Sequence, residues 1–181
     1  MTDYTLQPIP GKTLSRRLPE GTALVLEGGG LRGYYSCGVM EAFMEKDLLF
    51  PYIIGVSAGA ANALSYISGQ PGRSREIIEH YVGNPDYVST RNLLTKHTMF
   101  DFDYIFGTVP EKHIFFDWDK FHEQDTRFLT GAMNCADGKT VWFEKDTLKA
   151  PFMASRASCS VPLITKIQHY MGYDLLDGGI S

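Results

Sequence analysis

Cysteine is scarce in this sequence, and the N-terminus lacks the features of an export signal. Cys37, Cys135 and Cys159 are the three cysteines among 181 residues. Their odd number and wide spacing match neither a disulfide framework nor a zinc site, so we expect a reducing compartment. The polar segment 1–10 has neither the basic start nor the apolar stretch of a signal peptide. These absences predict a cytoplasmic protein.

Excess positive charge and long apolar runs are also missing. Seventeen Lys and Arg against 21 Asp and Glu give a net charge of -4, so no overall positive field attracts nucleic acid. The most apolar long stretch, 52–69, is interrupted by Gly55, Ser57, Gly59 and Asn62, whereas a membrane-spanning helix needs about 20 continuous apolar residues. We therefore expect no nucleic-acid partner and no transmembrane span, which leaves a peripheral contact as the form of any membrane association.

What is present is the composition of a globular domain. Hydrophobic residues make up 44% of the chain and charged residues 21%, with a mean hydropathy of -0.15. Residues 1–21 carry three prolines and no periodicity, which predicts an extended N-terminal arm. Residues 22–181 then form one domain. The glycine turn at 177–179 normally leads into another element, so we expect that a C-terminal part of the sheet is missing.

Two strand-turn-helix units open this domain. The apolar run in 22–27 ends at three glycines and precedes an amphipathic helix over 31–48. A second apolar run, 52–54, is followed by a helix of small residues over 58–68. Such units predict an α/β fold with a parallel-rich central sheet, helices on both faces in three αβα layers, and functional loops at the strand C-terminal ends.

The remainder of the chain is less regular. Eight of the 23 aromatic residues fall between Phe100 and Phe121 and fit no single period, so 93–121 predicts an irregular insertion or a small helical cap. These aromatics could line an apolar pocket or touch a lipid surface, or they could simply cover the sheet. The other expected elements are a helix over 73–82, a hairpin over 126–143, a helix over 147–160 and strands over 163–167 and 173–176.

The second turn contains a nucleophile motif. Residues 55–59 read Gly-Val-Ser-Ala-Gly, which matches G-x-S-x-G between a strand and a helix. The turn needs a strained backbone at Ser57, and side chains at Gly55 or Gly59 would collide with neighbouring elements. The following helix N-terminus also favours negative charge. The motif indicates a serine nucleophile, and a chance helix start rich in small residues is the alternative.

The first turn, Gly-Gly-Gly-Leu-Arg-Gly at 28–33, has three interpretations. It fits a dinucleotide-binding fingerprint, but that fingerprint expects an acidic residue ending the second strand. Here the second strand ends at Ser57, and the nearest acid, Asp47, precedes that strand. The same glycines could offer backbone N–H groups to an oxyanion. They could also serve only to let a helix pack closely.

A serine nucleophile needs a base. Asp177 follows an apolar strand and precedes two glycines, which suits a carboxylate delivered to the functional edge of the sheet, although aspartate is also common in ordinary turns. The residues alone leave this choice open. The other candidates are the five histidines, His80, His97, His113, His122 and His169.

Taken together and in this order, the motifs at 28–33, 55–59 and 177–179 resemble those of the patatin-like phospholipase family. That family carries a G-G-G-x-R-G loop, G-x-S-x-G and then D-G-G or D-G-A. The resemblance extends from about residue 24 to 179. It includes the pair Ala154-Ser155 with Pro162, which is similar to an A-S-x-x-x-P segment ahead of the aspartate.

The resemblance implies a Ser-Asp dyad in place of a triad. Ser57 would be the nucleophile and Asp177 the base, which leaves the histidines without a role. The oxyanion hole would be formed by the backbone of Gly28, Gly29 and Gly30.

The implied activity is that of a serine esterase of the lipase or phospholipase A type. It would cleave lipid acyl esters through an acyl-enzyme, with no cofactor and no metal. Arg32 matches an arginine of the family motif, and it either shapes the loop or binds an anionic head group as part of the substrate site. A lipid-binding or scaffolding protein of the same fold without turnover is one alternative. A dinucleotide-binding module is the other.

Overall fold

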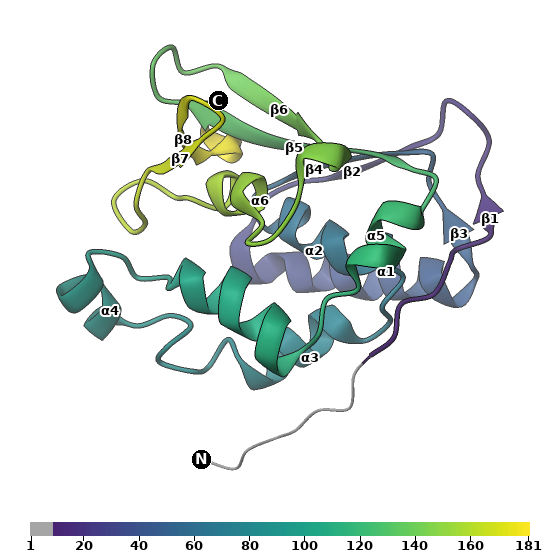
Figure 1. Ribbon diagram of the computed structural model, residues 1–181, viewed down its shortest axis with the longest axis horizontal. Helices are drawn as coiled ribbons and strands as arrows, with labels where there is room; N and C mark the ends of the chain where they lie inside the picture. The colour runs from purple at the N-terminus through teal and green to yellow at the C-terminus, as the bar shows by residue number, and fades with distance from the viewer. Residues whose placement is uncertain (1–8) are drawn as a thin grey trace.

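A mixed sheet forms the centre of the protein in the computed structural model, which describes residues 9–181 (Figure 1). The strands of this sheet are β2 (Ala23–Leu26), β4 (Tyr52–Val56), β5 (Arg127–Asn134), β6 (Thr140–Glu144), β7 (Gln168–Tyr170) and β8 (Tyr173–Asp177). β2 pairs with β4 and β4 with β5 in parallel, whereas β6 and β8 pair with β5, and β7 with β8, in antiparallel fashion. The two expected strand-turn-helix units are therefore confirmed as parallel neighbours.

Helices cover one face of this sheet, which confirms the α/β class, whereas the helix layer expected on the other face is not present among residues 9–181. In the view of Figure 1 the labelled helices lie on the lower side of the sheet. The helical segments are η1 (Gly30–Gly33), α1 (Tyr34–Glu45), α2 (Ala58–Ile67), α3 (Arg73–His80), α4 (Thr90–Lys96), η2 (Tyr104–His113), α5 (Trp118–Glu123), η3 (Lys145–Thr147), α6 (Met153–Ser158) and η4 (Gly178–Ile180).

The two faces of the sheet differ because side chains alternate along each strand. Ile53, Phe128 and Ala132 are each 0% exposed and belong to the main apolar core. On the alternate face, Val25 is 68% and Trp142 is 47% exposed. The sheet thus buries one face under helices, and that face supplies the side chains that the central sheet contributes to the main core.

The N-terminal segment packs onto the domain. Leu14 is 2% exposed and joins the main core, and β1 (Arg16–Arg17) pairs in parallel with β3 (Leu48–Leu49). The described part of the expected arm, residues 9–21, is therefore held against the domain through β3 and the ends of helices. The remaining part of that expectation, residues 1–8, lies outside the described residues.

Two expected elements differ from the observed ones. The helix expected over 147–160 is confined to α6, because Pro151 restricts the residue before it to non-helical backbone and separates η3 from α6. The strand expected over 163–167 is a turn, in which Leu163 has φ of 70° and the Thr165 N–H donates to the Val161 carbonyl. The strand before the turn at 171–172 is β7 instead.

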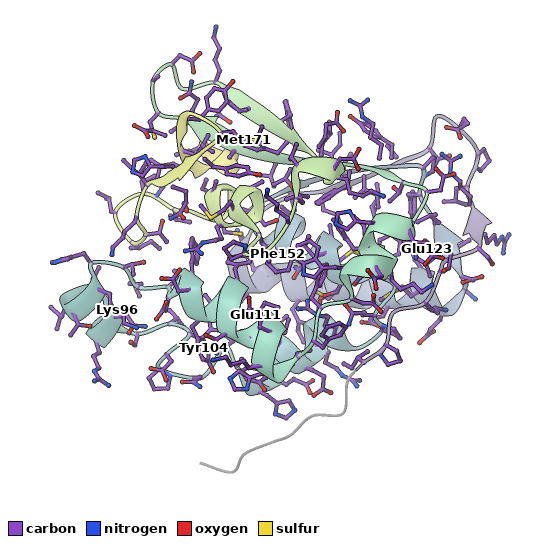
Figure 2. All side chains as sticks on the ribbon, in the orientation of Figure 1. Lys96, Tyr104, Glu111, Glu123, Phe152 and Met171 are labelled. Carbon is purple, nitrogen blue, oxygen red and sulfur yellow. The ribbon has the colours of Figure 1, made fainter. Side chains whose placement is uncertain are left out.

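Of the two structures expected for the aromatic insertion, the helical one is observed. The insertion contains α4, η2 and α5. Phe116 and Phe121 are 1% and 0% exposed and lie in the main core. Phe116 also makes an edge-to-face contact with Phe152, with ring centroids 4.9 Å apart. Figure 2 shows Phe152 near the middle of the molecule, below α6. The insertion thus joins the core that supports the sheet.

β5 determines where the functional loops meet. β6 occupies one edge of β5, so β4 and β8 share the other edge. Val56 pairs with Gly131, and Asp177 pairs with the next residue, Ala132. The C-terminal ends of β4 and β8 therefore meet end to end on β5. This register brings the residue after Val56, which is Ser57, next to Asp177.

Candidate active site

Ser57 lies at a sharp turn between β4 and α2. Its backbone has φ of 52° and ψ of -128°, a conformation that is strained for a residue with a side chain. A Cβ added at Gly55 would lie 2.7 Å from Ala60 Cα, and one at Gly59 would lie 2.3 Å from the Leu26 carbonyl oxygen. Both glycines are therefore required for α2 to approach the sheet this closely.

The structure brings the two expected dyad residues into contact. Ser57 Oγ lies 2.6 Å from Asp177 Oδ2, and the two residues are 120 positions apart in sequence. Asp177 is 5% exposed. Its other oxygen, Oδ1, accepts the Gly179 N–H at 2.8 Å, and its own N–H donates to the Ser160 carbonyl at 2.8 Å. The carboxylate thus accepts two hydrogen bonds and the backbone of the residue makes a third, with Oδ2 directed to the serine.

The glycine loop lies against the same serine. A Cβ at Gly28 would be 2.9 Å from Ser57 Cβ, so only glycine fits at this approach. Gly29 and Gly30 have φ of 153° and 56°. Within residues 9–181, the N–H groups of Gly28 and Gly29 donate to no protein acceptor. These donors are available to a ligand beside Ser57.

The expected A-S segment is present, but the serine in contact with the turn is a different one. Ser158 Oγ accepts the Ser57 N–H at 2.8 Å and donates to the Gly131 carbonyl at 2.6 Å. Ser155, the serine singled out from the sequence, is buried, and its hydroxyl has no hydrogen-bond partner in the described part of the chain. The signal was available, because Ala157-Ser158 stands at the A-S-x-x-x-P spacing before Pro162 and Ala154-Ser155 does not.

Asn62 also supports the site without any sequence signal. It lies one turn into α2, and its Nδ2 donates to the Gly33 carbonyl at 3.2 Å. Arg32 is exposed, and its side chain lies beside Gly29, where an added Cβ would be 3.8 Å from Arg32 Nε. Both interpretations of Arg32 stay open predictions. None of the five histidines hydrogen-bonds to Ser57 or Asp177 within the described chain.

A neighbouring thiol does not compete with the serine. Cys159 lines the same cavity as Ser57. Burial, and then the negative charge of Asp177, raise the pKa of the Cys159 thiol far above its usual value. Since the thiolate is the reactive form, this cysteine stays protonated and inert at neutral pH.

A cavity of about 330 Å³ begins at Ser57, a volume at the low end of the range for small-molecule sites. One wall is the face of α2 that carries Ala58, Ala61 and Ser65. The opposite walls come from α3, from Phe152 and from the aromatic insertion, which contributes Phe100, Phe102, Ile105, Phe106 and Pro110. Part of the insertion therefore lines an apolar pocket while the rest fills the core.

Residues 9–181 contain neither a metal-binding cluster nor a membrane-spanning helix. No group of three or more His, Cys, Asp or Glu side chains in this range is arranged to hold a metal ion. No helix in the same range combines the length and apolar character needed to cross a membrane.

Comparison with known proteins gives the family. A sequence profile of the family "Patatin-like phospholipase" matches residues 24–181. The chain belongs to this family. The matched region contains both turns and the Asp177 motif, and it excludes the N-terminal segment. The dinucleotide-binding interpretation of the glycine loop loses its support, because the three motifs belong together in a single patatin-like domain.

Similar proteins match over part of their length. The uncharacterized protein YjjU of Escherichia coli K12 is 33% identical over 102 residues, which are 56% of this chain and 29% of that protein. A patatin-like phospholipase domain-containing protein of Cryptococcus neoformans is 40% identical over 57 residues, which are 32% of this chain and 6% of that protein. The chain thus spans less than a third of either relative.

One solved structure aligns with nearly the whole chain. The crystal structure of VipD from Legionella pneumophila aligns with 99% of this chain and 51% of that chain, at a TM-score of 0.47 and 14% identity.

Proposed function

We propose that this chain is a serine acyl hydrolase that cleaves lipid acyl esters through an acyl-enzyme. Ser57 is the nucleophile, Asp177 is the general base, and the backbone N–H groups of Gly28, Gly29 and Gly30 bind the oxyanion. The observation that carries the proposal is the 2.6 Å contact between Ser57 Oγ and Asp177 Oδ2 beside an apolar cavity.

The proposed reaction has two halves that use the same groups. Ser57 Oγ attacks the ester carbonyl carbon while its proton passes to Asp177 Oδ2. The C–O bond to the alcohol then breaks, and the alcohol leaves with that proton. Water attacks the acyl-enzyme, its proton passes to the same carboxylate, and Ser57 regains a proton as the carboxylic acid is released.

The surroundings of the dyad support this chemistry. Charge develops on the carbonyl oxygen during attack, and each properly placed donor is worth about 10² to 10³ in rate. Within residues 9–181 the N–H groups of Gly28 and Gly29 donate to no protein acceptor, and Gly28 packs against Ser57. The Ser158 hydroxyl accepts the Ser57 N–H, which keeps the nucleophile in its strained turn. The apolar cavity suits an acyl chain.

Apolar side chains at the cavity support a peripheral membrane contact as part of the proposal. Leu31 and Tyr34 line the cavity and are 65% and 41% exposed. Apolar side chains left in water around a ligand cavity are typical of lipid-contacting surfaces.

A fluorophosphonate probe followed by mass spectrometry tests the enzyme. We expect a phosphonyl adduct on Ser57 in the wild type, no adduct there in Ser57→Ala, and slower labelling in Asp177→Asn. Ser155→Ala is the matched control, because it removes a buried hydroxyl without a partner and should label as the wild type does. A folded chain that takes no label at Ser57 and cleaves no short acyl ester would refute the proposal in favour of a lipid-binding or scaffolding role.

A further inference from the structure

A second polar cluster lies in the cavity, away from the dyad. Ser65, Arg73 and Ser74 line the cavity beside its apolar side chains. Arg73 is 5% exposed and Ser65 is 3% exposed. Arginine is almost never buried to this degree unless an anion pairs with it. The cluster is not used by the proposed dyad chemistry and needs its own explanation.

The guanidinium of Arg73 is held by neutral groups. Nη1 donates to Ser65 Oγ at 3.1 Å. Nε and Nη2 face the carbonyl oxygens of Phe115 and Ile114 at 3.4 and 3.5 Å, which is longer than a normal N–H to O hydrogen bond of about 2.7 to 3.2 Å. The guanidinium carbon also lies 5.0 Å from the Phe116 ring centroid. Of the five N–H donors of the guanidinium, one thus makes a hydrogen bond of normal length within residues 9–181.

No carboxylate compensates this charge within residues 9–181, where every ion pair involves other residues. Burial lowers the pKa of Arg73 to about 9, so the side chain is still charged at neutral pH. A buried cation without a counter-ion is costly. A carboxylate that reached it would form a charge-assisted, bidentate pair.

The position of Arg73 relative to the nucleophile follows from α2. Ala58, Ala61, Asn62 and Ser65 all line the cavity, and their spacing puts them on one face of the helix. Ser65 is eight residues beyond Ser57, which at about 1.5 Å per residue separates them by about 12 Å along the axis. The cavity therefore runs along α2 from the serine to the cation.

Resting on the acyl hydrolase function above, we propose that Arg73 selects acyl chains that end in a carboxylate. An extended chain advances about 1.2 Å per bond, so about ten carbons attached at Ser57 would bring their far end to the guanidinium. The substrates are then esters of medium-chain dicarboxylic acids with one acid group free. A methyl-ended chain of equal length leaves the cation unpaired.

Matched ester pairs test this selection in the intact protein. One pair is the 4-nitrophenyl monoester of decanedioic acid and 4-nitrophenyl decanoate, and the other is the corresponding hexanedioic and hexanoic pair. We expect the free acid group to raise kcat/KM at least tenfold in the ten-carbon pair and to lower it in the six-carbon pair, which is too short to reach Arg73. A ten-carbon ratio below one in the wild type would overturn the proposal.

Variants of Arg73 separate ligand binding from support of the 114–116 segment. Arg73→Met should reduce the ten-carbon ratio about a hundredfold, whereas Arg73→Lys keeps the cation and should retain most of the preference. If Arg73→Met leaves the ratio unchanged, the guanidinium only holds the loop. Should Arg73→Met fail to fold, the wild-type ratios and the lysine variant still decide the question.

The two proposals fail in different ways. Hydrolysis of 4-nitrophenyl butyrate, which does not reach Arg73, reports the dyad alone. Calorimetry on Ser57→Ala measures the cavity without turnover, and there monomethyl decanedioate, which carries one free carboxylate, should bind at least tenfold more tightly than the neutral ester methyl decanoate. Absent butyrate hydrolysis would refute the acyl hydrolase function, whereas equal or weaker binding of monomethyl decanedioate would refute the role of Arg73.

Discussion

Ser57 and Asp177 reach the same edge of β5 on strands of opposite direction. Ser57 directly follows β4, which is parallel to β5, and the turn around it is completed within five residues. Asp177 ends β8, which is antiparallel to β5 and comes after α6 and β7. The nucleophile side is therefore built from local sequence, whereas the carboxylate side depends on contacts between distant segments.

The difference shows which parts of such a site are locally encoded. The serine turn needs residues without side chains at fixed positions, and the glycines that meet this need can be recognised in the sequence. The carboxylate needs β8 to stop where β4 stops, which follows from the pairing of Gly131 and Ala132 with the two strand ends. Substitutions on the two sides should therefore act differently.

The largest effect is expected at the end of β8. Asp177→Asn should lower kcat on a short acyl ester about 10² to 10⁴-fold, because the amide cannot take the serine proton. The matched control is Asp174→Asn on the same strand, whose carboxylate contacts His169 at the surface and whose loss should leave kcat within twofold. Steady-state kinetics with thermal unfolding as a check on folding decides, and equal rates for the two variants would contradict a base on β8.

An intermediate effect is expected where the two sides are joined. Ser158→Ala leaves the Ser57 N–H and the Gly131 carbonyl without their shared partner, at a cost of about 1 to 3 kcal/mol. We expect kcat to fall about tenfold to a hundredfold with little change in KM. Ser155→Ala, one turn earlier on α6, should keep both constants. A uniform loss of stability without a selective drop in kcat would mean that Ser158 supports only the fold.

The smallest effect is expected on the nucleophile side, along α2. Ala61→Leu places a larger side chain on the cavity wall between Ser57 and Ser65. Each buried methylene is worth about 0.8 kcal/mol. Excluding part of a ten-carbon chain should therefore lower kcat/KM for 4-nitrophenyl decanoate about tenfold. Hydrolysis of 4-nitrophenyl butyrate, measured in the same variant, should stay unchanged. A parallel fall for both esters would indicate a disturbed turn at Ser57 in place of a blocked cavity.

Much of the nucleophile side could be predicted from the sequence. The apolar runs, the glycine turns and the small residues of α2 indicate β2, β4 and α2 nearly to the residue. Both serine-flanking glycines meet the close contacts that their motif requires. These features are short-range, so the pattern of a few residues contains the reason for the structure.

The carboxylate side was predicted less well for physical reasons. The spacing to Pro162 distinguishes Ser158 from Ser155 in the sequence, but the contact of Ser158 with β5 depends on which face of α6 meets that strand. The strand expected over 163–167 is a turn because its apolar side chains are not used in the sheet, as Leu163, at 95% exposed, illustrates. The burial of Arg73 could not be predicted from the sequence either, because the charged residues of α3 are typical of a solvent-exposed helix.

If Ser57 and Asp177 form the proposed dyad, the end-to-end arrangement of β4 and β8 links activity to local opening of the C-terminal hairpin. β8 is held by three register pairs to β5 and three to β7, while β4 is paired along its length on both sides. Fraying of the C-terminal hairpin withdraws the carboxylate and leaves the serine turn intact. Amide hydrogen exchange should accordingly be faster in 168–177 than in 52–56, and turnover should be lost under mild denaturant before the parallel core melts.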